Sequence, residues 1–148
     1  MSFLTWYPLP LLLHLSPINA SFLVTVYNSA LREWAGMIGV HLIVDGITEA
    51  PVSAETIEHI LKDLPHRIDM SILDGPYVVK GVPENPGYTG IEVIDKSHIA
   101  IHSFDETNTV SIDVYSCKPF NAKKTVEYLK EHIKFNKITT RVITREII

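Results

Sequence analysis

Only one cysteine, Cys117, occurs in the 148 residues, so no disulfide bond can form within one chain. A lone thiol is typical of a reducing compartment, and we expect a cytoplasmic protein. A basic surface is missing as well. The net charge is −4, and no cluster of Lys and Arg is large enough to bind nucleic acid. These absences exclude a disulfide-stabilised domain and a nucleic-acid-binding protein.

Long uninterrupted apolar segments are also missing. The most apolar stretch, residues 1–22, contains three prolines and is too short for a transmembrane helix. No Lys or Arg precedes its apolar run, as a signal peptide would require. We expect translation to start at Met37, with residues 1–36 as an extension outside the fold, because regular patterns begin directly after Met37.

What remains is the composition of one soluble globular domain over residues 37–148, with 46% apolar and 20% charged residues in the whole chain. Two segments have helical periodicity. The first follows a predicted N-cap at Ser53, and we expect Pro65 to end it; its apolar stripe comprises Ile57, Ile60, Leu61 and Leu64. The second follows a predicted N-cap at Asn121, and its Val126, Leu129 and Ile133 should face the core.

The other segments predict strands, because they are rich in β-branched residues or alternate apolar with polar side chains. They comprise residues 38–45, 70–80, 89–94, 97–104, 110–116 and 137–148. The predicted order is β-α-β-β-β-β-α-β. Each helix has one apolar stripe and can cover one sheet face only, so we predict an α/β (α+β) fold, a two-layer sandwich with a mainly antiparallel sheet.

A serine, two histidines and the cysteine fall close together, at Ser97, His98, His102 and Cys117. On a strand, His98 and His102 share a face but lie roughly 13 Å apart, too far to bind one metal ion, so we expect no metal site. A hydrolase would present its serine in a Gly-x-Ser-x-Gly turn, which is missing. A pair formed by the Cys117 thiol and the His102 imidazole remains an alternative.

Five segments together resemble the small prokaryotic S-adenosylmethionine decarboxylases, which are made as proenzymes. These are residues 39–45, 87–90, 97–103, 113–117 and 126–130. The most specific feature is the pattern Ser-His-x-x-Ile-His followed by a cysteine fifteen residues after the second histidine. The resemblance covers Met37 to about Arg145.

The resemblance implies that the chain cuts itself between Lys96 and Ser97 into a β chain (37–96) and an α chain (97–148). Ser97 then becomes a pyruvoyl group, the only cofactor expected. A pyruvoyl carbonyl forms a Schiff base with the substrate's amino group and accepts the electrons left when carbon dioxide departs. The expected product serves spermidine and polyamine biosynthesis.

The resemblance also implies roles for individual residues. His102 is the base that removes the Ser97 Cα proton, and the Thr89 hydroxyl stabilises the tetrahedral intermediate of self-cleavage. Cys117 is the proton donor in decarboxylation. Glu106 binds the ribose hydroxyls of the substrate, and Phe104 stacks on its adenine. The implied functional unit is a homodimer of processed protomers, with active sites near the subunit interface and no membrane partner.

Thr89 stands where the family usually has serine, and three further positions depart from the family pattern. Lys96 replaces a glutamate, Phe104 replaces a tryptophan, and Pro83 stands where the family has an aromatic residue. The substrate pocket is therefore matched less well than the processing machinery. Two alternatives stay open: a pyruvoyl-dependent arginine decarboxylase on the same scaffold, and a non-catalytic paralogue that binds a ligand or a partner.

Overall fold

The computed structural model describes residues 37–95 and 97–147, so the predicted extension (1–36) and Lys96 lie outside the described residues. The element order is the predicted one. The elements are β1 (Met37–Thr48), α2 (Ala54–Arg67), β2 (Ile72–Lys80), β3 (Tyr88–Ile94), β4 (Ser97–Phe104), β5 (Thr109–Ser116), α3 (Ala122–His132) and β6 (Phe135–Glu146).

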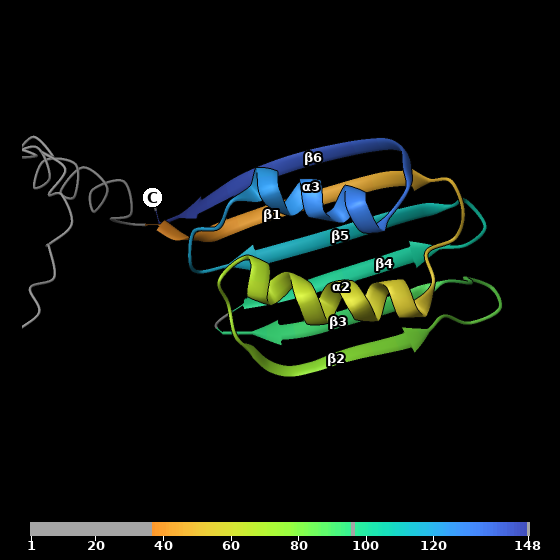
Figure 1. The fold of residues 1–148 in the computed structure, drawn as a ribbon, viewed down its shortest axis with the longest axis horizontal. Coiled ribbons are helices and arrows are strands. Elements are labelled where there is room, and N and C mark those ends of the chain that lie inside the picture. The colour runs from red at the N-terminus through yellow and green to blue at the C-terminus, as the bar shows by residue number, and fades with distance from the viewer. Residues whose placement is uncertain (1–36, 96, 148) are drawn as a thin grey trace, which may run out of the picture. The chain divides into compact units, whose positions relative to one another are not determined.

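The six strands form one sheet in the order β2-β3-β4-β5-β1-β6, and every neighbouring pair is antiparallel. Both helices lie on the same face of this sheet (Figure 1). No element within residues 37–95 and 97–147 covers the other face, which we call the open face. The predicted two-layer α+β sandwich is confirmed. Among the described residues, no helix is both long and apolar enough to cross a membrane.

The core lies between the helices and the covered face of the sheet. Alternate residues of the central strands are buried there, such as Ile99 and Ile101 on β4 and Ile112 and Val114 on β5. Helix α2 contributes its predicted stripe of Ile57, Ile60, Leu61 and Leu64, all fully buried. The helix can approach closely because Gly90 has no side chain: a Cβ there would lie 2.4 Å from Ile57.

The predicted end of the first helix is wrong. Pro65 does not end α2, which continues to Arg67 with the proline in its last turn. On α3 the predicted side faces the core, since Leu129 and Ile133 are buried and the half-buried Val126 packs against the core; Tyr128 is buried as well. The Tyr128 ring is covered by the Arg67 guanidinium, 4.7 Å from the ring centroid, so a residue with a polar tip can occupy the boundary between the helices.

Glu92 is an exception within this core. It lies on β3, on the covered face, with 0% of its surface exposed. Neither carboxylate oxygen has a hydrogen-bond partner among the described residues. Burial raises the pKa of Glu92, the nearby Asp74 raises it further, and Lys62 lowers it in part. Folding therefore makes the Glu92 carboxyl harder to ionise than an exposed carboxyl.

This carboxyl makes stability depend on pH. The folded protein holds the Glu92 proton more tightly than the unfolded chain, whose pKa is the ordinary 4.5. The contribution of the Glu92 carboxyl to the free energy of unfolding is fully present below pH 4.5. It is lost as the pH rises through the raised pKa of Glu92. We therefore expect Glu92→Leu to raise the free energy of unfolding at pH 8 by about 1–3 kcal/mol, with a smaller gain at pH 4.

Urea titrations of the two proteins at several pH values would measure this difference. Glu84→Leu, which changes an exposed loop carboxylate, is the matched control and should leave the stability nearly unchanged. A gain for Glu92→Leu that is equal at pH 4 and pH 8 would contradict the ionisation argument.

Candidate active site

The β3–β4–β5 hairpins bring Ser97 and Cys117 together at one end of the sheet. Ser97 begins β4 and Cys117 follows directly after β5, and the two strands are in register through the pair His98–Tyr115. The backbone N–H of Cys117 donates a hydrogen bond of 3.1 Å to the Ser97 Oγ. The serine is half-buried, and the cysteine is exposed.

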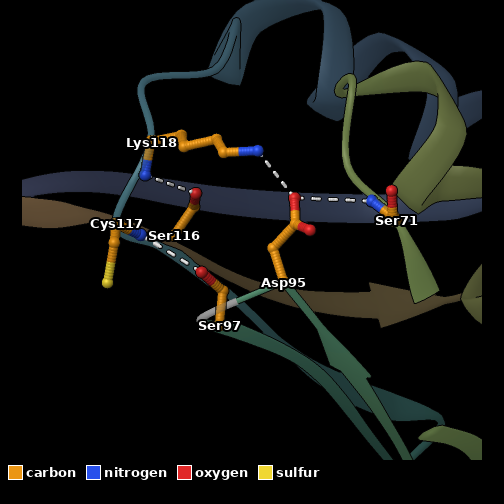
Figure 2. A network of polar contacts seen from close by, with 6 residues as sticks. All are labelled: Ser71, Asp95, Ser97, Ser116, Cys117 and Lys118. Atoms are coloured by element: carbon orange, nitrogen blue, oxygen red, sulfur yellow. Dashed lines mark hydrogen bonds and ion pairs between the residues drawn. The ribbon is translucent and has the colours of Figure 1, made fainter. Parts of the chain in front are cut away.

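A pocket of about 480 Å³ opens beside these two residues, lined by Leu73, Asp95, Ser97, Cys117 and Lys118. An ion pair of 2.8 Å joins the Lys118 Nζ to the Asp95 Oδ2, as Figure 2 shows. The Lys118 side chain holds the pKa of Asp95 below its usual range. The pocket therefore contains a hydroxyl, a thiol and a complementary charged pair.

The thiol of Cys117 also contacts Tyr115. Its Sγ lies 3.7 Å from the phenol oxygen, as a donor, and this contact raises the pKa of Tyr115. The Tyr115 ring packs on Gly39, where a Cβ would lie 2.8 Å from the ring, and the Arg145 guanidinium lies 4.8 Å from the ring centroid. Both contacts fix the phenol next to the thiol.

The other predicted site residues gather at the opposite end of β4. Thr89 on β3 pairs with His102 across the sheet, and the Thr89 Oγ1 lies 3.1 Å from the His102 Nδ1. Phe104 ends β4 and Glu106 lies in the following turn, and both are exposed. Two of the residues to which the resemblance gives processing roles, Thr89 and His102, are therefore in contact.

Ser97 and His102 are not brought together within one chain. Five residues of strand separate them, which corresponds to roughly 16 Å, and the odd spacing directs their side chains to opposite faces of the sheet. Cys117 lies at the Ser97 end, so the same separation applies to a pair formed by Cys117 and His102. The predicted site is divided into two halves along β4.

Comparison with known proteins agrees with the resemblance. Residues 40–146 match the S-adenosylmethionine decarboxylase family. A protein from Clostridium botulinum named S-adenosylmethionine decarboxylase proenzyme is 34% identical over 111 residues, which is 72% of this chain and 93% of the relative. The chain belongs to the S-adenosylmethionine decarboxylase family. The matched segment covers nearly the whole length of this bacterial relative.

A second proenzyme of the family, from Hydrogenobaculum, is 27% identical over 119 residues, covering 77% of this chain and 86% of the relative. The fold agrees with the crystal structure of the adenosylmethionine decarboxylase from Aquifex aeolicus, with a TM-score of 0.64 and 22% identity over 76% of this chain and 94% of that one. These relatives favour a decarboxylase of this family over the arginine-specific and non-catalytic alternatives.

The structure adds polar residues on the open face that the sequence patterns did not select. The His41 Nε2 lies 2.9 Å from the Asp113 Oδ1. Burial lowers the pKa of His98, which shares this face with His41 and Tyr115. Alternation places these residues on the polar side of their strands, but only the strand order makes them neighbours.

Proposed function

We propose that the chain is a proenzyme that cleaves itself between Lys96 and Ser97 and then decarboxylates S-adenosylmethionine in the cytoplasm, for spermidine and polyamine biosynthesis. The observation that carries the proposal is the hydrogen bond from the Cys117 N–H to the Ser97 Oγ beside an open pocket. It joins the predicted cofactor precursor to the predicted proton donor, as the family's chemistry requires.

Self-cleavage uses the Ser97 hydroxyl as the nucleophile. Its Oγ forms a bond to the Lys96 carbonyl carbon while the C–N bond breaks, and the hydroxyl proton ends on the Ser97 nitrogen. Loss of the Cα proton of Ser97 then breaks the Cβ–Oγ bond and releases the Lys96 carboxylate. Water then hydrolyses the remaining dehydroalanine. The former Ser97 nitrogen leaves as ammonia, and a pyruvoyl group remains. No oxidant or reductant is needed. The Cys117 N–H, which donates to the Ser97 Oγ, stabilises the negative charge that develops on this oxygen when the Cβ–Oγ bond breaks and the carboxylate leaves.

The residues around Ser97 fit the proposed cofactor. When formed, a pyruvoyl group supplies the electron sink that decarboxylation needs. Cys117 lies within hydrogen-bonding reach of Ser97 through its backbone, and its exposed thiol can deliver a proton to substrate in the pocket. Glu106 offers two carboxylate oxygens to ribose hydroxyls, and Phe104 offers a ring to adenine.

The open face of the sheet supports a homodimer. On this face the adjacent strands β2 and β3 expose a group of apolar side chains, Tyr77, Val79, Ile91 and Val93, and β6 exposes Ile143 at the opposite edge of the sheet. Contiguous exposed apolar residues are typical of protein interfaces, and a twofold axis lets one surface pair with its own copy. We propose that two processed protomers meet through this face.

A dimer would bring the two halves of the divided site together. His102 cannot reach Ser97 in its own chain, because roughly 16 Å of strand lies between them. In an antiparallel arrangement of two copies, the Thr89–His102 end of one protomer lies near the end of β4 in the other. Ser97 is the first residue of that strand, so it can be reached past the end of the sheet although its side chain is directed to the covered face. We propose that each active site takes Ser97 and Cys117 from one protomer, and Thr89, His102, Phe104 and Glu106 from its partner.

Self-cleavage predicts two fragments in a denaturing mass spectrum, residues ending at Lys96 and residues 97–148 with a blocked pyruvoyl terminus. Ser97→Ala removes the nucleophile and should stay intact. Ser111→Ala, which changes a half-buried serine on β5, is the matched control and should cleave. A wild-type chain that remains whole after prolonged incubation would refute the proposed processing.

The proton-donor role of Cys117 predicts that Cys117→Ala cleaves but decarboxylates poorly. We expect carbon dioxide release from carboxyl-labelled S-adenosylmethionine to fall about 100-fold, the usual contribution of a positioned acid. Labelled arginine, tested in parallel with wild-type protein, should release almost none. Full activity of Cys117→Ala would contradict the role of Cys117 as proton donor. Faster carbon dioxide release from arginine than from S-adenosylmethionine would show that arginine is the substrate.

The shared site predicts complementation between two defective chains. His102→Ala alone should cleave at least about 100-fold more slowly, because the base is lost. When His102→Ala is co-expressed with Ser97→Ala, about half of the His102→Ala chains should pair with the other variant and be cut, as random pairing in a twofold dimer requires. Size tags distinguish the chains. If the His102→Ala chain stays intact in mixed dimers, the base does not come from the partner.

A further inference from the structure

Asp95, two residues before Ser97, is held in a fixed position. Its φ of +33° lies in the left-handed region, which Asp and Asn tolerate better than most residues. The Asp95 N–H donates to the Ser71 carbonyl at 3.0 Å, and the Asp95 Oδ2 accepts from the Ser71 N–H at 3.5 Å. This reciprocal pair ties the β3–β4 connection to the segment between α2 and β2.

Lys118 contacts the same carboxylate from the opposite side. Figure 2 shows its side chain reaching from the end of β5 to the Asp95 Oδ2, with the Cys117 thiol directed away from this pair. The Lys118 N–H donates at 2.9 Å to the Oγ of Ser116, which is fully buried, so the backbone at the base of the lysine is anchored in the core.

Two adjacent residues therefore connect the end of β5 to the β3–β4 connection. Cys117 contacts the Ser97 hydroxyl, and Lys118 contacts the Asp95 carboxylate. A serine hydroxyl rotates among three staggered positions, and the Cys117 N–H selects one of them only while the two segments stay close. The ion pair spans the same gap, so it keeps the hydrogen bond to Ser97 in place.

An ion pair this exposed adds little to global stability, since 61% of the Lys118 side chain is accessible to solvent. The ion pair instead affects the position of the Ser97 hydroxyl. Self-cleavage needs the Ser97 oxygen within attack distance of a neighbouring carbonyl, and small displacements of a reacting atom reduce rates strongly.

We propose that the Lys118–Asp95 ion pair positions Ser97 for self-cleavage, and that it afterwards joins the two fragments across the cut. This inference rests on the proposed function, because Asp95 would belong to the fragment ending at Lys96 and Lys118 to the fragment beginning at Ser97. Lys118 and Asp95 are positioning residues, since they act through the Ser97 hydroxyl and the segment that holds it.

The test compares cleavage rates of freshly made chains, followed by mass spectrometry over time. Lys118→Met removes the charge but keeps most of the side-chain length, and it should slow cleavage about tenfold or more. Lys118→Arg preserves the charge and should stay within about threefold of wild type. Lys123→Met, which changes an exposed lysine of another surface ion pair on α3, is the matched control and should cleave normally.

Asp95→Asn gives a second, independent route to the same contact. Asparagine tolerates a positive φ and can still accept from the Ser71 N–H, so this variant removes only the charge facing Lys118. The double variant Lys118→Met with Asp95→Asn should cleave no more slowly than either single one. High salt should slow wild type and leave Lys118→Met unchanged, because salt screens an exposed ion pair.

Three results would overturn the inference: cleavage at the wild-type rate in both single variants, multiplied losses in the double variant, or equal slowing in Lys123→Met. Each of these leaves the proposed function intact, provided that wild type cleaves and Ser97→Ala does not. A wild-type chain that never cleaves would instead refute the proposed function. Melting temperatures within about 2 °C of wild type would show that the variants are folded.

Discussion

The register of the β3–β4–β5 hairpins determines the neighbours of every candidate site residue. Ile94 pairs with Ser97 across the first hairpin, and His98 pairs with Tyr115 across the second. A shift by one residue would turn the buried Ile99 and Ile101 to the open face, so burial of apolar side chains fixes the register strongly. The same constraint that builds the core therefore places the Ser97 hydroxyl beside the Cys117 N–H.

Covering only one face of the sheet has a second consequence. The helices bury the apolar residues of the central strands on their side, while the other face retains polar groups and exposed apolar groups in the same rows. A solvent-facing sheet surface does not need Ile91, Val93 and Tyr77, but a surface that meets its own copy does. The proposed dimer would thus satisfy a packing requirement and complete a divided active site together.

The ends of the strands differ from their centres in the kind of interaction that holds them. In the centre, burial and the backbone ladder suffice. Beyond β5, the Lys118 side chain and the Asp95 carboxylate connect two segments that no strand pairing joins. Surface ion pairs rarely contribute much stability, but here the pair flanks the predicted cleavage position. Its location, rather than its strength, makes it important for the chemistry.

Element order, the antiparallel two-layer fold and the family could be predicted from the sequence, because periodicity and capping residues are local signals and the Ser-His-x-x-Ile-His pattern is contiguous. The C-terminal end of α2 and the burial of Tyr128 on α3 could not be predicted, since contacts such as Arg67 over Tyr128 depend on how the helices pack. Only the tertiary structure showed that Ser97 lies with Cys117, and His102 with Thr89, at opposite ends of one strand. The ion pair between Asp95 and Lys118 joins residues far apart in sequence, and only the sheet order makes them neighbours.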